Sequence, residues 1–285
     1  MCRKVRNIDL TVPANEAFIT ENASNERAPM KIITYSDVHL EFGYNWHPPT
    51  DIDGDVMLLA GDIVSFKHYN PLKFLLKFWN KPVIYISGNH EYYNTNMDVA
   101  ERVALEWISR KLPNVHYLKN SAVEIDGVHF YGGTMWTDFD GGNYQAMRYA
   151  QEYMNDYWVI RTDKTQKLTP EDTLKFHERY VENLIKRFET DLSGPRVVLS
   201  HHAPIPGPTG LNRHGMREIE PAYTSRDMIK IIDKYQPDFW VYGHTHQPND
   251  QTFGKTRIIS NPRGYAFRHE LCEDFDPYGK PVEVK

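Results

Sequence analysis

The sequence predicts an α/β fold, and three patterns in it support that prediction. Short apolar runs that end in glycine or polar residues are typical of buried strands. Up to Leu112 these runs alternate with segments of helical spacing, as in a largely parallel sheet covered by helices. The pair Asp126-Gly127 between two apolar runs then predicts a β-hairpin, which suggests an antiparallel stretch or a second sheet.

The first part of the chain should contain strands in regular alternation with helices. Strands are expected over Ile32–Tyr35, Asp55–Ala60 and Val83–Ile86. One helix should run from Pro71 to about Trp79, because proline is favoured at the first helical position. A second helix should be capped by Asp98 and continue to Leu112.

The second part of the chain alternates less regularly. Strands are expected over Val115–Leu118, Ala122–Tyr131, Arg196–Leu199 and Phe239–Tyr242, with a last strand at Arg257–Ser260. A long helix should open at Thr169-Pro170 and reach about Leu192, and a shorter one should cover Ser225–Tyr235. Residues 132–168 are rich in glycine and tyrosine and are expected to be irregular.

A row of tyrosines in that irregular stretch allows two interpretations. Tyr149, Tyr153 and Tyr157 are spaced by four residues and are accompanied by Arg148 and Arg161. They could form a lid that stacks on a ring of a substrate. The alternative is a helix that packs its aromatic face on the core, which is the commoner outcome for such a row.

The length of 285 residues allows one large α/β domain or two small ones. No repeat, low-complexity tract or linker separates two cores, so residues 30–285 are expected to form a single domain. Residues 1–29 are polar and lack periodicity. They are expected to be a flexible extension, or a segment upstream of a natural start at Met30.

Composition excludes several classes of protein. A net charge of −5 and a pI near 6.2 argue against a general nucleic-acid surface or an anionic-membrane surface. Cys2 and Cys272 are the only cysteines, too few for a disulfide framework or a cysteine-rich zinc module. Neither a membrane-spanning run nor a secretory signal is visible, so a cytoplasmic location is expected.

Polar side chains stand where the expected strands end. In open α/β sheets, ligands bind in the crevice outside the carboxyl ends of the strands. The side chains that occupy such positions here are carboxylates, imidazoles and one amide: Asp37, His39, Asp62, Asn89, His201, His244 and His246.

These residue types in this arrangement predict a metal centre. Asp37 and His39 are two residues apart, as are His244 and His246, so in extended backbone each pair would point to one side. Oxygen and imidazole ligands without sulfur suit Mn, Fe, Zn or Ni. The set is too large for one open coordination shell but fits two shells that share a carboxylate, which predicts two ions that clamp a phosphate.

Each of these residues taken singly has a structural explanation. A lone aspartate at a strand end is usually a turn or cap residue, and a lone histidine is usually hydrogen-bonded structure. Five separate strands that all end in metal-ligand types are improbable by chance, so their joint occurrence favours the metal interpretation.

The motifs together resemble those of the calcineurin-like metallophosphoesterases. Five appear in the family's order, and they are Asp37-Val38-His39, Gly61-Asp62, Gly88-Asn89-His90-Glu91, His201 and Gly243-His244-Thr245-His246. The resemblance covers about Met30 to Gly264 and implies a four-layer α/β/β/α sandwich of two mixed sheets flanked by helices.

The resemblance also implies roles for individual residues. Asp37, His39, Asp62 and His246 would hold one divalent ion, and Asp62 as a bridge would hold the other with Asn89, His201 and His244. Manganese is the first expectation. His90 would act as general acid or as a stabilising cation. The implied reaction is in-line attack of a metal-bridging hydroxide on a small phosphomonoester or phosphodiester, a nucleotide being one candidate.

The chain departs from the family pattern at two places. His201 is followed by His202, and His201 is expected to be the ligand, with His202 either on the substrate side or in support of a ligand. Many members carry an acidic residue shortly after Gly-Asp, but Gly61-Asp62 is followed by an acid-free run, so such a carboxylate must come from elsewhere. Arg263 and Arg213 are expected substrate contacts, although a solvated surface arginine is an equal alternative for each.

Two other functions compete with a small-molecule phosphoesterase. A nuclease of the same fold would need a long basic groove or an added DNA-binding domain, and the acidic chain shows neither. A non-catalytic scaffold of the same fold would be expected to lack some of the ligands or the catalytic histidine, and all are present.

Overall fold

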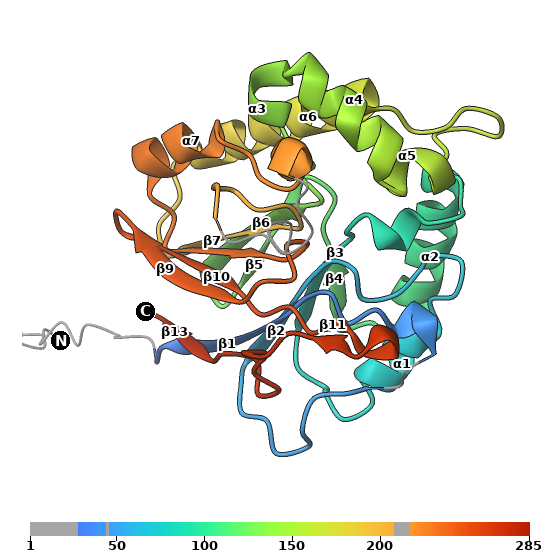
Figure 1. The fold of residues 1–285 in the computed structure, drawn as a ribbon. Coiled ribbons are helices and arrows are strands. Elements are labelled where there is room, and N and C mark those ends of the chain that lie inside the picture. The colour runs from blue at the N-terminus through green and yellow to red at the C-terminus, as the bar shows by residue number, and fades with distance from the viewer. Residues whose placement is uncertain (1–27, 44–45, 208–216) are drawn as a thin grey trace, which may run out of the picture.

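Two mixed β-sheets packed face to face form the centre of the computed structural model, which describes residues 28–43, 46–207 and 217–285 (Figure 1). The first sheet has the strand order β13, β1, β2, β3, β4, with bounds Val282–Val284, Met30–Tyr35, Val56–Ala60, Val83–Ile86 and Val115–Tyr117. In it β1 to β4 run parallel and β13 pairs antiparallel with β1.

The second sheet begins with the predicted hairpin. Its order is β5, β6, β7, β8, β10, β9, with bounds Ser121–Ile125, Val128–Gly133, Arg196–Ser200, Phe239–Tyr242, Thr256–Ser260 and Asn249–Phe253. The strands β6, β7, β8 and β10 run parallel, and β5 and β9 are antiparallel edges. Asp126 and Gly127 both have positive φ angles (46° and 71°), as the tight hairpin turn requires.

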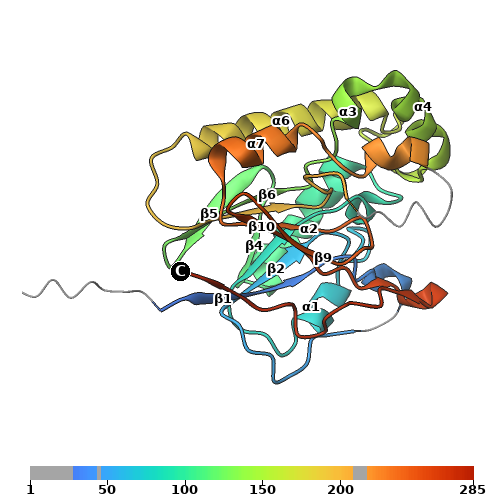
Figure 2. The ribbon, with the colours of Figure 1, turned by 60° about the vertical axis from the view of Figure 1, so that its left-hand side comes forward.

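Helices cover the outer face of each sheet. α1 (Pro71–Leu75) and α2 (Met97–Lys111) lie on the first sheet, and α6 (Pro170–Phe188) and α7 (Met228–Tyr235) on the second (Figure 2). Alternate residues of a strand therefore enter different cores: Ile32 lies between the sheets, and Ile33 lies under the helices. The predicted α/β sandwich of two mixed sheets is confirmed.

Residues 132–168 were expected to be irregular, and that prediction was wrong. They contain α3 (Phe139–Gly142), α4 (Tyr144–Tyr153) and α5 (Asp156–Val159). The tyrosine row divides between α4 and α5: Tyr157 is buried in the core, Tyr149 packs partly against it, and Tyr153 is exposed. Glycine-rich flanks and short helices concealed the helical period.

Several element boundaries also differ from the prediction. α1 ends at Leu75 and α6 at Phe188, both short of the expected residues. The cap of α2 is Asn96, whose side chain accepts a hydrogen bond from Val99 N, and not Asp98. Arg257–Ser260 is not the last strand, because short strands follow: β11 (Gly264–Tyr265), β12 (Glu270–Leu271) and β13. Strands of two or three residues carry no periodic signal.

Two expectations fall on residues that the structure does not describe. Residues 1–27 of the proposed extension are among them, and so is Arg213. Among the described residues, none of the helices combines the length and hydropathy that crossing a membrane requires.

Candidate metal centre

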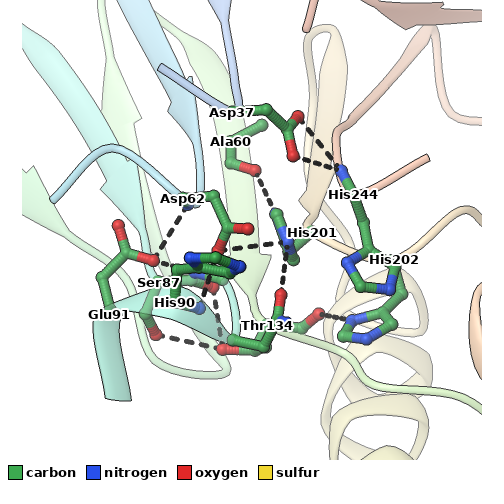
Figure 3. A network of polar contacts seen from close by, with 12 residues as sticks. Asp37, Ala60, Asp62, Ser87, His90, Glu91, Thr134, His201, His202 and His244 are labelled. Atoms are coloured by element: carbon green, nitrogen blue, oxygen red, sulfur yellow. Dashed lines mark hydrogen bonds and ion pairs between the residues drawn. The ribbon is translucent and has the colours of Figure 1, made fainter. Parts of the chain in front are cut away.

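The predicted ligands lie together where strands of both sheets end. Asp37 and His39 follow β1, Asp62 follows β2, and Asn89 follows β3. His201 follows β7 in the second sheet, and His244 and His246 follow β8 (Figure 3 shows part of this cluster). All are buried except His246, which is partly exposed.

The side chains form two ligand groups with Asp62 between them. One group is Asp37, His39 and His246, and the other is Asp62, His201 and His244; His39 and Asp62 also lie close enough to His90 for these three to share an ion. Asp62 Oδ1 lies 3.4 Å from His201 Nε2, and Asp62 Oδ2 lies 3.9 Å from His39 Nε2. The two oxygens of one carboxylate thus face different groups.

Distances within the groups suit coordination to a common ion. His246 Nε2 is 3.3 Å from Asp37 Oδ1 and 3.1 Å from His39 Nε2, and His201 Nε2 is 3.0 Å from Asn89 Oδ1. Ligand atoms about 2.1 Å from one ion, at tetrahedral or octahedral angles, are separated by about 3.0–3.4 Å. The buried His244 Nε2 has no hydrogen-bond partner within the described part of the chain. Divalent ions therefore fit these residues.

The backbone at the ligands is left-handed and not extended, which corrects one expectation. Five of them have positive φ angles: Asp37 (51°), His39 (53°), Asp62 (56°), His244 (66°) and His246 (51°). Such conformations are uncommon outside glycine and are concentrated at functional sites. Asp37 and His39 lie in one group all the same, whereas His244 and His246 lie in different groups, as the family resemblance implied.

Glycines in the motifs allow the strand ends to approach closely. A Cβ atom added to Gly88 would collide with Asp62 Oδ1 and lie 2.7 Å from the His201 ring. One added to Gly243 would lie 2.7 Å from Asp37 Oδ2. A side chain at either position would push a ligand out of place.

Buried charges set the protonation of the site. Burial raises the pKa of Asp62, but the neighbouring histidines outweigh it and hold the pKa well below its usual range. Burial lowers the pKa of His39, and burial with the neighbouring His202 and His201 lowers that of His244. Burial would lower the pKa of His201, but the charge of Asp62 and the hydrogen bond to it raise that pKa to about 10, so His201 must release a proton when it binds metal. Ionised carboxylates and neutral imidazoles are the forms that bind metal.

His201 lies in a ligand group, whereas His202 does not. His201 Nδ1 donates to the carbonyl of Ala60 (2.8 Å), and its Nε2 faces Asp62 (Figure 3). The same Nε2 lies 3.0 Å from Asn89 Oδ1. His202 Nδ1 bonds to the carbonyl of Thr134 (3.3 Å), and its ring packs on Trp136. Burial and the charge of His201 lower the pKa of His202 to about 3.

His90 stands beside the ligands, and both of its ring nitrogens have other partners. Nδ1 donates to Glu41 Oε1 (2.9 Å), and Nε2 lies 3.2 Å from the hydroxyl of Tyr265. Burial would lower the pKa of His90, but the charge of Asp62 and the hydrogen bond to Glu41 raise it to about 9. The imidazole is therefore doubly protonated and positively charged at neutral pH.

Many family members carry an acidic residue shortly after Gly-Asp, and this chain has none there. Glu41 supplies a carboxylate at the site instead. Its Oε1 accepts from both His90 Nδ1 and His39 Nδ1 (3.0 Å), and its Oε2 is buried without a partner within the described chain. One oxygen thus fixes a predicted ligand and the predicted catalytic histidine. Its position two residues after His39 was the available signal, and the sequence reasoning missed it.

Two further carboxylates hold the turn after β3. Glu91 accepts hydrogen bonds from Asp62 N (2.9 Å) and Gly88 N (2.7 Å), which joins the ends of β2 and β3. Asp156 in α5 accepts from Asn89 Nδ2 (2.8 Å), so Asn89 Oδ1 faces His201. No sequence signal pointed to Asp156, because α5 was expected to be irregular.

A cavity of about 490 Å³ opens over the cluster. Asp62, Asn89, His90, His244 and His246 line it from the strand ends, and its other walls include Tyr93, Tyr153, Asp156, Tyr223, Tyr265 and Arg268. Neither His202 nor Arg263 lines it. Arg263 donates to the carbonyl of Val38 (3.4 Å) and lies over Trp46, whereas Arg268 lines the cavity, alone among the arginines that the structure describes.

The chain is similar to proteins from several organisms. An uncharacterized protein of Acanthamoeba polyphaga mimivirus is 28% identical, over 87% of this chain and 95% of the viral protein. A UPF0046 protein of Caenorhabditis elegans is 25% identical, over 76% of this chain and 64% of its own length. The structure of a phosphopantetheinyl hydrolase from Mycobacterium tuberculosis has a TM-score of 0.64 at 18% identity, covering 90% of this chain and 96% of that one, and so shares the fold.

The family match extends over most of the chain. Residues 30–248 match the model of the calcineurin-like phosphoesterase family, and this range includes all the motifs described above. The chain therefore belongs to the calcineurin-like phosphoesterase family.

Proposed function

We propose that the chain is a metal-dependent enzyme that hydrolyses a small phosphomonoester or phosphodiester. One observation carries the proposal: two groups of carboxylate and imidazole ligands meet at Asp62, beside a cavity of about 490 Å³. Membership of the calcineurin-like phosphoesterase family supports the same class of reaction.

The ligand groups support two divalent ions. One would be held by Asp37, His39, Asp62 and His246, and the other by Asp62, Asn89, His201 and His244. Manganese is our first expectation, with Fe, Zn or Ni as alternatives, because these ions accept oxygen and imidazole ligands. When bound, the ions would neutralise phosphate charge and make a water nucleophilic at neutral pH.

The side chains around the ligands supply the remaining functions. His90, with its pKa raised to about 9, can stabilise developing charge as a cation, or protonate the leaving oxygen once its Nε2 is released from the Tyr265 hydroxyl. Glu41 fixes the orientation of its ring. Tyr93 stacks on His90 (4.0 Å between ring centroids) and Tyr223 on His244 (4.5 Å), so each tyrosine covers one face of an imidazole.

Hydrolysis assays on metal-stripped protein test the proposal. Mn, Ni, Zn, Fe or Mg is added back, and p-nitrophenyl phosphate, bis-p-nitrophenyl phosphate and a phosphopantetheine ester are offered as substrates. Activity should return with metal, fall by about 10²-fold or more in His90→Ala, and vanish in Asp62→Asn. The ratio between the first two esters measures the preference for monoester or diester. Failure to bind any of the ions would overturn the proposal.

A further inference from the structure

A tyrosine outside the family motifs, Tyr265, lies next to the predicted metal ligands. Tyr265 belongs to β11, and the residues before it are tied to the end of β1: Arg263 N donates to Ser36 O and Gly264 N to Asp37 O, both at 3.0 Å. A Cβ atom on Gly264 would lie 2.6 Å from the carbonyl of Glu270, so only glycine fits this turn. The tether holds Tyr265 next to the predicted ligands.

The ring and hydroxyl of Tyr265 contact several members of the cluster. Its ring centroid lies 4.4 Å from that of His39 and 4.5 Å from that of His246. Its hydroxyl lies 3.2 Å from His90 Nε2, opposite the nitrogen that Glu41 holds. Glu41, His90 and Tyr265 thus form a hydrogen-bonded row.

The row opens onto the cavity at its Tyr265 end. His90 and Tyr265 line the cavity, whereas Glu41 does not. A phenol hydroxyl can accept one hydrogen bond and donate another, so it can join His90 to an oxygen in the cavity. An ordinary phenol keeps its proton at neutral pH, so the hydroxyl remains a donor.

We propose that Tyr265 is a further catalytic residue, whose hydroxyl donates a hydrogen bond to the leaving oxygen of the phosphoester beside His90. The inference rests on the proposed function. The hydrogen bond strengthens as the ester P–O bond breaks and negative charge gathers on the leaving oxygen, so it stabilises the transition state more than the bound substrate. No residue of the family motifs occupies this position.

The substitution Tyr265→Phe tests the proposal, because it removes the hydroxyl and keeps the ring. Tyr131→Phe is the control: it likewise removes one hydroxyl and one hydrogen bond (to Tyr180 O), but Tyr131 is buried in β6 and does not line the cavity. Both variants are assayed with p-nitrophenyl phosphate and with phenyl phosphate, whose leaving oxygen is more basic.

Tyr265→Phe should lower kcat for phenyl phosphate about tenfold and kcat for p-nitrophenyl phosphate about twofold, with KM nearly unchanged. Two readouts besides activity accompany the assay. Metal content by atomic emission should equal that of the wild type, and vanadate binding by calorimetry should weaken about fivefold or more. Tyr131→Phe should change none of these quantities.

Equal losses on both esters, a loss of metal, or an unchanged kcat would each overturn the role of Tyr265 and leave the proposed function standing. Absence of hydrolysis by the wild-type protein with every metal and ester would instead overturn the proposed function, and the role of Tyr265 with it. The two failures are therefore distinguishable.

Discussion

At the scale of single residues, the site depends on side chains that each hold more than one partner. Asp62 faces two ligand groups, and Glu41 bonds to two imidazoles through one oxygen. A histidine that donates from Nδ1 to a carboxylate is fixed in orientation and in tautomer, and its other nitrogen becomes a better ligand. Glu41 should therefore influence both metal affinity and catalysis.

Glu41→Gln should weaken metal binding about 10- to 100-fold, because the amide keeps the shape of Glu41 but removes the charge that supports His39. Calorimetric titration of metal-stripped protein measures the change. Glu124→Gln is the control, since Glu124 also pairs with a histidine (His129, 3.6 Å) but is exposed and far from the ligands in the fold. Equal affinities for wild type and Glu41→Gln would contradict the prediction.

At the scale of elements, the strands end at the site, and the helices that cover the sheets are stabilised at their termini. α6 is the longest described helix of the outer layer on the second sheet, and its buried face includes Tyr180 and Leu184. Its first turn has a capping box, in which the side chain of Thr169 accepts from Asp172 N and the side chain of Asp172 accepts from Thr169 N. This cap satisfies amide groups that the helix itself cannot.

Thr169→Ala should lower the free energy of unfolding by about 1 kcal/mol, because it removes the cap and leaves Asp172 N without its side-chain partner. Urea denaturation should show a lower midpoint with an unchanged m-value. Thr190→Ala, at an exposed position after the same helix, should shift the midpoint much less. A midpoint for Thr169→Ala equal to that of the control would refute the importance of the cap.

At the scale of the whole molecule, the site joins the two sheets. Asp37, His39, Asp62 and Asn89 come from the first sheet, and His201, His244 and His246 come from the second. The unfolded chain cannot present these groups together, so ions that bind the assembled site stabilise the folded state. Metal and fold should be thermodynamically linked.

Removing metal with a chelator should lower the melting temperature, and adding back Mn at about 100 times its dissociation constant should restore about 2.7 kcal/mol of stability. Differential scanning calorimetry measures the effect. Asp62→Asn is the control, because it weakens both ligand groups and should reduce the metal-dependent shift. A melting temperature that does not respond to metal would count against the metal centre.

The sequence by itself determined the fold class and predicted most of the residues of the site. Apolar runs such as Val83–Ile86 coincide with strands because both faces of each sheet are buried, so burial leaves a strong local signal. The polar residues that follow those runs meet in space because the carboxyl ends of parallel strands lie at one edge of a sheet.

Only the tertiary structure decided how those residues are supported. The family resemblance already implied that His244 and His246 would hold different ions, but the left-handed backbone at both residues is seen only in the structure. Glu41 and Tyr265 reach His90 from positions 49 and 175 residues away in the chain. Contacts of this kind depend on how two sheets pack, and no local pattern of residues encodes that packing.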